Sequence, residues 1–396
     1  MNPDFLLKNE TARRLYENYA KDLPVIDFHN HLSVADIAKD RRYENLTELW
    51  LEPDPYKHRL MRICGVDEFY ITGGADPDAK FEKFCEIFPD MAGTPVYDWS
   101  RMELDRYFGI RELPDKKTAK NIYKTAEKFL KKPKFSTVFL LKTNKIEHQS
   151  PVATLDQDLT PYLEVGVSPS LRGDNLLSTE PIPHLQQRLA AFSAAGCRFA
   201  DHSLDTGFFE TGNTEQLIEL AGEYAKRGWT LLLHLGALRQ TSTRLAQRVG
   251  PAGGYAAMGK GVEIERLAAL LDEMEQKYAL PQTVLFPLNP RDFEALAVLQ
   301  GSFSGKVQLG PAWWWCDHAS GIRQALDCIA SYGVLSQFIG MTTDSRSILS
   351  FARHDYFRRI LCQWISEQDW GQSEEQLGRL IRKICYENAK RRYADV

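Results

Sequence analysis

Residues 25–31 read VIDFHNH, and the fold prediction begins with this stretch. Its short apolar run, bounded by Pro24 and Asn30, predicts a β-strand. Seven further runs of the same kind follow between longer helical stretches. They are Thr137–Thr143, Leu163–Ser170, Cys197–His202, Trp229–Gly236, Thr283–Leu288, Lys306–Gly310 and Phe338–Thr343. Strand followed by helix, repeated to eight strands, is the pattern of the closed (β/α)8 TIM barrel, which we therefore predict.

The segments between these runs support the same fold. Thr214–Arg227 and Gly261–Lys277 are amphipathic, and Gly228 is typical of a helix C-terminal cap. Several strand runs are apolar on both faces, which suits parallel strands buried on both sides. A doubly wound open sheet is the competing arrangement. It is disfavoured because no GxGxxG motif follows the first strand.

The first two predicted strands are separated by a long segment, 33–135. It contains helical patterns at Glu44–Leu51, Pro55–Cys64, Asp78–Phe88 and Arg101–Phe108. We interpret it as a mostly helical insertion over the barrel mouth, because the βα-loops of barrels carry such insertions and form the active site. Residues 1–396 are then one barrel domain, closed by helices at Asp355–Trp364 and Ser373–Arg391.

The composition excludes several classes of protein. The chain has 396 residues, 43% of them hydrophobic and 26% charged, which is ordinary for a globular enzyme. A net charge of −4 offers no basic field for nucleic acid. Neither a signal peptide nor an apolar stretch of about 18 residues is present, so no membrane partner is expected. Seven cysteines without a CxxC spacing argue against disulfides and thiolate zinc sites, and favour the cytoplasm.

A metal site is predicted where the first and last strands end. His29 and His31 are alternate residues of one strand, so both imidazoles point to the same side, a pattern that suits zinc or a similar divalent metal. Asp344 ends the eighth strand, which lies beside the first in a closed barrel. A buried carboxylate there is costly unless it is paired or bound to metal. The alternative role of Asp344 is the N-cap of the next helix.

Other polar residues follow the remaining strands. His234 ends the fifth strand, where it either faces the site or is a buried histidine bonded to a carbonyl. Asp201 ends the fourth, where it forms with His202 either an acid/base pair or a structural pair.

Arginine and tryptophan side chains complete the predicted site. Arg172 follows the third strand and Arg346 follows the eighth. Their guanidinium groups suit a carboxylate substrate or an enediolate, although a surface salt bridge is the alternative for each. Trp313, in the Trp-Trp-Trp run after the seventh strand, serves either packing or stacking against a sugar.

Taken together these residues resemble the uronate isomerases of the amidohydrolase superfamily, nearly from end to end. The matching segments are DFHNHL (27–32), DRRYENLTELWL (40–51), GVDEFYITG (65–73), RYFGI (106–110), ADHSL (200–204), GWTLLLHLGA (228–237), LNPRD (288–292), GMTTDSRS (340–347) and RHDYFRRILC (353–362).

The resemblance implies reversible isomerisation of small sugar acids, D-glucuronate to D-fructuronate and D-galacturonate to D-tagaturonate. It implies one divalent metal, usually zinc, near His29, His31 and Asp344, with His234 at the site but less firmly a ligand. The remaining residues that it brings to catalysis or substrate binding are Tyr56, Arg172, Asp201, Trp313 and Arg346. Moving a proton between C2 and C1 needs a base, a proton carrier and a cation but no hydride acceptor. The oligomeric state stays open, a homo-oligomer included.

The chain departs from the family in three places. Pro55 stands where the family has the histidine of a His–Tyr pair involved in proton transfer, so the acid/base assignment is open. As a proline it is expected to begin the helix that carries Tyr56. The segment 142–148 lacks the acidic Thr-Thr-Asp-Asp of the family, and the chain is shorter around strands three to five.

Two other functions compete. A hydrolase of the same superfamily, such as a sugar-acid lactonase, is disfavoured because the sixth strand has no histidine and the fourth no lysine. A non-catalytic sugar-acid binding protein is disfavoured because His29, His31 and Asp344 are all present.

Overall fold

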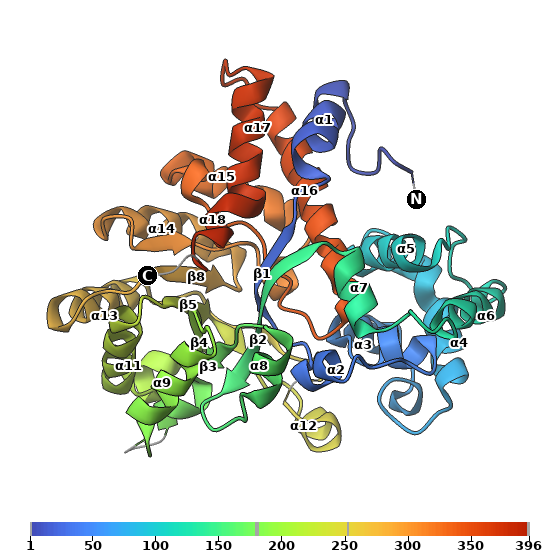
Figure 1. The fold of residues 1–396 in the computed structure, drawn as a ribbon, viewed down its shortest axis with the longest axis horizontal. Coiled ribbons are helices and arrows are strands. Elements are labelled where there is room, and N and C mark those ends of the chain that lie inside the picture. Colours follow the sequence, from blue (N-terminus) through green and yellow to red (C-terminus); the bar gives the residue numbers. More distant parts are fainter. Residues whose placement is uncertain (1, 179–181, 252, 394–396) are drawn as a thin grey trace.

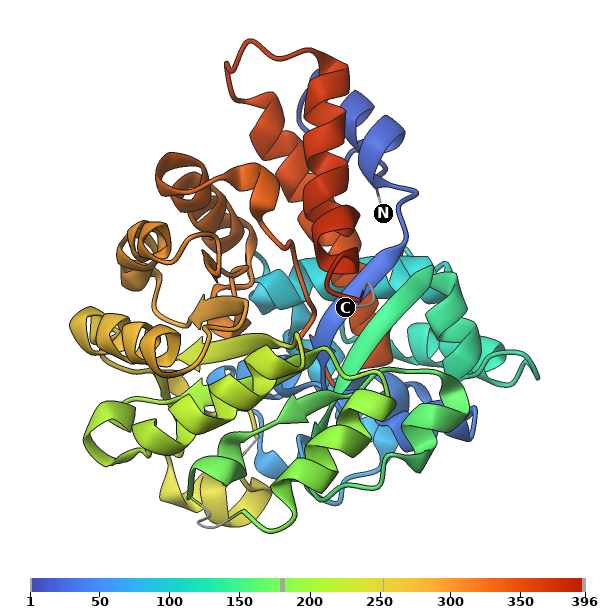
Figure 2. The ribbon, with the colours of Figure 1, turned by 60° about the vertical axis from the view of Figure 1, so that its left-hand side comes forward.

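Seven parallel strands form one curled sheet in the computed structural model, which describes residues 2–178, 182–251 and 253–393. The sheet order is β1-β2-β3-β4-β5-β8-β9. The strands are β1 (Val25–Asn30), β2 (Ile146–Thr154), β3 (Ser170–Arg172), β4 (Phe199–Leu204), β5 (Thr230–Leu235), β8 (Thr283–Pro287) and β9 (Val307–Leu309). Helices cover the outside of the sheet (Figures 1 and 2). The predicted (β/α)8 barrel class is confirmed.

The barrel is closed by an irregular segment. The predicted eighth strand, Phe338–Thr343, is not a strand. It still lies along β1, because the Asp344 amide donates to the His29 carbonyl at 3.1 Å and the His31 amide donates to the Ser345 carbonyl at 2.9 Å. Positive φ angles at Gly340 (84°) and Asp344 (47°) interrupt the extended backbone. The strand prediction was therefore wrong, whereas the position beside the first strand was right.

One predicted strand is a helix, and a second overlaps the end of a helix. Thr137–Thr143 is α7, whose N-cap Ser136 accepts from the Phe139 amide, and the strand follows it as β2. The predicted strand Leu163–Ser170 overlaps α8 (Thr160–Val165), and β3 begins only at its last residue. Both errors have one cause: a short apolar run is compatible with a buried strand and with a short buried helix.

The other helices of the barrel include the two amphipathic segments expected from the sequence, seen as α11 (Thr214–Lys226) and α13 (Ile264–Lys277). The remaining helices and the small hairpin are α1 (Glu10–Leu15), α9 (Leu185–Ala194), α10 (Phe208–Thr211), β6 (Ala237–Leu238), α12 (Thr243–Val249), β7 (Ala257–Met258), α14 (Phe293–Leu299), α15 (Ala319–Tyr332), α16 (Ala352–Ser366), α17 (Glu374–Arg382) and α18 (Asn388–Lys390). No helix within the described ranges combines the length and apolar character needed to cross a membrane.

The segment between β1 and β2 is helical throughout much of its length. Its longer elements are α2 (Val34–Ala38), η2 (Thr47–Leu51), α3 (Pro55–Ile63), α4 (Pro77–Ile87), α5 (Pro95–Phe108), α6 (Ala119–Leu130) and α7 (Thr137–Thr143). In Figure 1, α3 to α6 form a cluster on the opposite side of β1 from α11, α13 and α14. Pro55 begins α3 as expected, and Asp54 caps the helix by accepting from the Tyr56 and Lys57 amides.

Candidate active site

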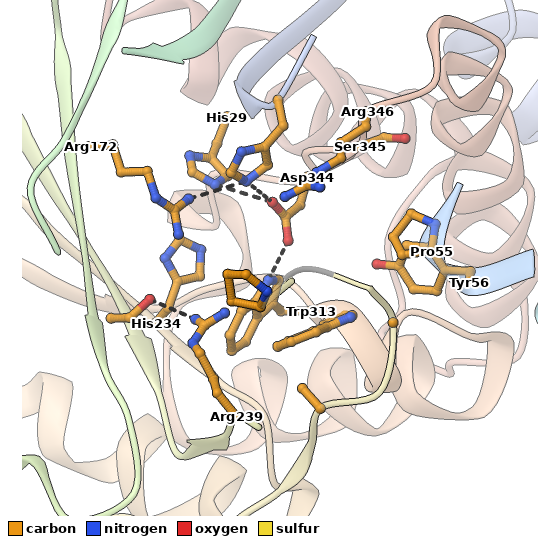
Figure 3. A pocket seen from close by; sticks show the side chains of 16 residues that line it. His29, Pro55, Tyr56, Arg172, His234, Arg239, Trp313, Asp344, Ser345 and Arg346 are labelled. Carbon is orange, nitrogen blue, oxygen red and sulfur yellow. Dashed lines mark hydrogen bonds and ion pairs between the residues drawn. The ribbon is translucent and has the colours of Figure 1, made fainter. Parts of the chain in front are cut away.

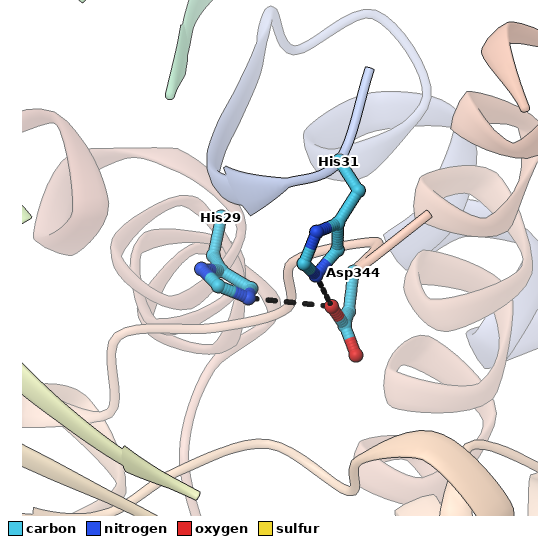
Figure 4. Close-up of side chains that lie close together, drawn as sticks. All are labelled: His29, His31 and Asp344. Atoms are coloured by element: carbon cyan, nitrogen blue, oxygen red, sulfur yellow. Dashed lines mark ion pairs between the residues drawn. The ribbon is translucent and has the colours of Figure 1, made fainter. Parts of the chain in front are cut away.

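Three metal-binding groups converge where β1 meets the closing segment. The Nε2 atoms of His29 and His31 lie 3.2 and 3.0 Å from the same oxygen, Oδ1 of Asp344. Figure 4 shows both imidazoles turned toward this carboxylate. The histidines share a face because they are alternate residues of β1, and backbone hydrogen bonds fix the register of Asp344 beside them.

Two members of this group have the charge state of metal ligands. Burial disfavours ionisation of Asp344, but hydrogen bonds from His29 and His31 outweigh it and hold the pKa of Asp344 well below its usual range. Burial lowers the pKa of His31 to about 4 despite the nearby carboxylate. Asp344 is therefore an anion and His31 a neutral imidazole near pH 7, the forms that bind a divalent cation.

The spacing of these atoms fits a metal ion. Ligands about 2.0–2.1 Å from a tetrahedral zinc are about 3.3 Å from one another. The separations of 3.0 and 3.2 Å between the imidazole nitrogens and Asp344 are close to that value. Donor atoms of all three residues lie within 4.8 Å of one another. The geometry and the nitrogen and oxygen donors fit a cation here.

Trp313 orients the carboxylate from the other side. Its indole Nε1 donates to Oδ2 of Asp344 at 2.6 Å, which leaves Oδ1 to the histidines. The Trp313 ring also packs on His234, with 4.6 Å between ring centroids. Trp313 thus lines the pocket and takes part in a polar contact as well as in packing.

Asp201 lies beneath the metal-binding group and does not line the pocket. Its two oxygens face Nδ1 of His29 and Nδ1 of His234, each at 4.0 Å, and have no hydrogen-bond partner in the described chain. Burial raises the pKa of Asp201 to about 6. His202 points away and bonds the Tyr224 hydroxyl at 2.9 Å, so the suggested Asp201–His202 pair does not form.

His234 reaches the pocket from β5. Burial, reinforced by the charge of His29, holds the pKa of His234 well below its usual range, so the imidazole is neutral. Its Nε2 is buried with no hydrogen-bond partner among the described residues. With His29 and Asp201 it forms a second group of possible metal-binding atoms within 4.8 Å. Of the two roles that the sequence left open for His234, the structure therefore supports a histidine that faces the site rather than one bonded to a carbonyl.

Arginines surround the pocket, which encloses about 730 Å³ including its open mouth. Arg172 is 2.8 Å from Asp174 and 3.8 Å from Asp201, and its Nη1 is 3.4 Å from Nε2 of His31. Arg346 forms no ion pair with any residue in the described ranges and lines the mouth. Figure 3 shows both guanidinium groups beside Asp344.

A third arginine was not identified from the sequence. Arg239 lines the pocket and is held by Asp205 at 2.7 Å and by Ser203 at 2.9 Å. It lies in Figure 3 on the side of His234 and Trp313. Its position shortly after β5 was the available signal, since the loops that follow barrel strands carry active-site residues.

Pro55 and Tyr56 form the wall of the pocket opposite Arg172 (Figure 3). The Tyr56 hydroxyl is buried and has no hydrogen-bond partner in the part of the chain that the structure describes. Burial raises the pKa of Tyr56 well above its usual range, so the phenol keeps its proton. His58, on the same helix, does not line this pocket.

The structure thus brings together His29, His31, Tyr56, Arg172, His234, Trp313, Asp344 and Arg346 around one pocket at the C-terminal ends of the strands. Asp201 supports them from below. Such a site can bind a cation and an anionic substrate, and it can offer a phenol as a proton donor.

Comparison with known proteins agrees with this geometry. The family model described as glucuronate isomerase matches residues 1–184 and 213–393. The uronate isomerase of Caldanaerobacter subterraneus subsp. tengcongensis is 37% identical, with 98% of each chain covered. That of Bacillus subtilis is 35% identical, with 98% of this chain and 97% of the relative covered. The first alignment spans 457 positions against 396 residues here, so the relative has segments that this chain lacks.

Solved structures show the same architecture. A uronate isomerase from Thermotoga maritima superposes with a TM-score of 0.92 at 25% identity, covering 99% of both chains. A glucuronate isomerase from Caulobacter crescentus gives a TM-score of 0.88 at 21% identity, covering 99% of this chain and 96% of the other, which supports the fold. By the family match and the full-length similarity to its relatives, the chain belongs to the uronate isomerase family.

Proposed function

We propose that this chain interconverts hexuronate aldoses and ketoses, D-glucuronate with D-fructuronate and D-galacturonate with D-tagaturonate, in the pocket lined by Asp344 and Arg346. One observation carries the proposal. In a member of the uronate isomerase family, His29, His31 and Asp344 converge on one point inside a pocket rimmed by arginines.

In this proposal a single divalent cation, zinc as the first candidate, is held by His29, His31 and Asp344. The ion would supply a positive charge that polarises substrate oxygens. Asp201 faces the Nδ1 side of His29, opposite the ligating Nε2, where a carboxylate orients a metal-binding imidazole. The 185–212 segment that contains Asp201 lies outside the family match, so its role rests on this geometry.

The arginines bind the anionic substrate. Arg346 has no carboxylate partner among the described residues, so its guanidinium is available to substrate oxygens without breaking an ion pair. Arg172 is partly neutralised by Asp174 and Asp201 and makes a weaker contribution to the field of the pocket. Trp313 lines the pocket and holds Asp344 in place through its indole N–H.

Proton transfer between C2 and C1 is assigned to groups that line the same pocket. Asp344 is ionised and can accept a proton, although its low pKa makes it a weak base. Tyr56 keeps its proton and can donate it to an oxygen at C1 or C2. His234 is neutral and can hydrogen-bond a substrate hydroxyl, and Arg346 can stabilise the enediolate.

We propose that the reaction takes place in the cytoplasm. All seven cysteines are free thiols in the structure, which supports a reducing compartment. A homo-oligomer and the lack of nucleic-acid and membrane partners stay predictions.

The test is proton NMR of both uronates in D₂O with the purified, zinc-loaded protein. Ketose formation and loss of the C2–H signal are expected, with D-glucose as the neutral control that exchanges far more slowly. A sugar-acid lactone is included in parallel. Inertness toward both uronates together with rapid lactone hydrolysis would show a hydrolase instead.

A further inference from the structure

A buried arginine outside the pocket contacts Tyr56, which lines the pocket, and the backbone next to Asp344. Arg353 lies on α16, is only 1% exposed and does not line the pocket. Its Nη1 donates to Oδ2 of Asp317 at 2.9 Å, and its Nη2 donates to the Thr343 carbonyl at 2.7 Å. Because Thr343 directly precedes Asp344, the guanidinium fixes the backbone next to the metal-binding carboxylate.

The same guanidinium lies over the ring of Tyr56, which lines the pocket. Cζ of Arg353 lies 5.2 Å from the ring centroid of Tyr56 and 4.7 Å from that of Trp99. A cation over an aromatic face is stabilising, and most strongly so when the pair is shielded from water. Tyr56 also meets Trp99 and Trp315 edge-on, with centroids 5.4 and 5.6 Å away.

These ring contacts are what fix the side chain of Tyr56. Its hydroxyl has no hydrogen-bond partner among the described residues, and the charged group that acts most strongly on the phenol is the Arg353 guanidinium. Pro55, the preceding residue, offers no imidazole to the phenol. Its ring position therefore depends on Arg353 and the two tryptophans.

The charge of Arg353 matters as well as its shape. Burying a guanidinium is costly unless it is paired, and Asp317 is its partner in an ion pair. Burial raises the pKa of Asp317 to about 6, while Arg353 itself stays cationic. A phenol that donates its proton gains negative charge, and the cation that lies over its ring is Arg353.

We propose that Arg353 is a positioning residue for catalysis: it holds Tyr56 at the pocket wall and places a fixed positive charge against the phenol during proton transfer. It does not touch substrate and acts through Tyr56. The inference rests on the proposed isomerase function, because only then does Tyr56 exchange a proton with a sugar.

The chain offers a matched control for the loss of a buried arginine. Arg358 is on the same helix and is 5% exposed, but it donates to the Leu23 and Pro24 carbonyls, away from the pocket. Arg358→Met therefore removes the same group from α16 without touching Tyr56. Arg353→Lys is the conservative variant, which keeps the charge and loses the fork.

Kinetics of the zinc-loaded protein form the first arm. Arg353→Met is expected to lower kcat about 10²-fold, with KM and zinc content little changed, and Arg353→Lys is expected to recover part of the loss. In a Tyr56→Phe background, Arg353→Met should cost little more, because its target is gone. Full additivity of the two changes, or an equal loss of kcat in Arg358→Met, would overturn the proposal.

Crystal structures of the wild type, Arg353→Lys and Arg353→Met form the second arm and do not depend on activity. The Tyr56 ring should keep its place with lysine and move with methionine. A Tyr56 ring that stays in place in Arg353→Met would contradict the positioning role. Should the methionine variant not fold, a Tyr56 ring that is displaced in Arg353→Lys with unchanged kcat would contradict it. If the wild type fails to isomerise uronates, the proposed function falls, while these structures still decide whether Arg353 positions Tyr56.

Discussion

At the scale of single residues, the site depends on how Asp344 divides its two oxygens. Oδ1 faces the two histidines and Oδ2 accepts from the Trp313 indole at 2.6 Å. The sequence predicted the two histidines and Asp344 because strand alternation and barrel closure place them together. It did not predict the indole contact, which depends on the path of the loop after β9.

The first prediction concerns Trp313. Trp313→Phe removes the indole donor and keeps an aromatic ring, so the cost is that of one hydrogen bond to a charged group, about 1.5–3 kcal/mol. We expect kcat/KM for D-glucuronate to fall about 10- to 100-fold. Trp229→Phe is the control, since the Trp229 indole has no hydrogen-bond partner in the described structure and does not line the pocket. Equal kcat/KM values for the two variants would contradict the role of Trp313.

Arg346 leads to a prediction about substrate charge. Arg346→Met removes a guanidinium without leaving a described carboxylate unpaired, so the loss reports contacts with the substrate. We expect about 2–5 kcal/mol less transition-state stabilisation for uronates. Turnover of D-glucose, measured in the same assay, should fall much less, because that substrate loses only the contact with the enediolate. A similar proportional loss on both sugars would show that Arg346 does not read the carboxylate or its charge.

At the scale of elements, the start of α3 determines what the pocket wall contains. Pro55 was expected to begin this helix, and it does, because proline fits the first turn and Asp54 satisfies the next amides. The lengths of β2 and β3 could not be predicted in the same way. Their neighbours α7 and α8 have short apolar runs that fit either state, and only the packing of the whole barrel selects the helix.

Replacing Pro55 tests whether the proton relay of the family can be restored. Pro55→His places an imidazole beside Tyr56, whose hydroxyl has no partner in the described chain. A general acid/base partner contributes about 10²–10⁴-fold, so we expect kcat on both uronates to rise, with zinc content checked in each protein. A kcat that stays the same or falls would mean that the chain has a complete relay built from other residues.

The base of the same helix carries a buried ion pair. Nζ of Lys57 lies 2.5 Å from Asp54 and 3.2 Å from Glu103, and all three side chains are buried. Asp54→Asn keeps the helix cap but leaves the ammonium with one carboxylate, at a cost of about 3 kcal/mol. Glu375→Gln, which breaks the exposed pair with Arg379, should cost at most about 0.5 kcal/mol. Urea unfolding of both variants measures the two losses in free energy of unfolding. Equal urea midpoints would contradict a stabilising role of the buried ion pair of Lys57.

At the scale of the whole molecule, the barrel could be predicted although two of its eight strand positions were wrong and a third is irregular. The runs that end in functional residues, at β1, β4 and β5, are the clearest strands in the sequence, and Ser203 is the one residue in these three strands that is not buried. Leu231, Leu232 and Leu233 are fully buried in β5 and lead directly to His234. The closing segment was harder to predict because side chains, such as Asp27 accepting from the Thr343 amide, replace part of its strand pairing.

Isomerisation of uronates at the His29–His31–Asp344 site is tested most sharply by removing the metal and then returning it. The measurement is the rate of ketose formation from D-glucuronate by the wild type and by the double variant His29→Ala/His31→Ala. Each protein is assayed after chelation and again after one equivalent of zinc, and the metal content of each sample is determined. We expect the chelated wild type to be inactive and one equivalent of zinc to restore its activity. The double variant should stay folded but neither hold the metal nor regain activity. Undiminished turnover in wild type shown to be free of metal, or stoichiometric metal and full activity in the double variant, would contradict this assignment.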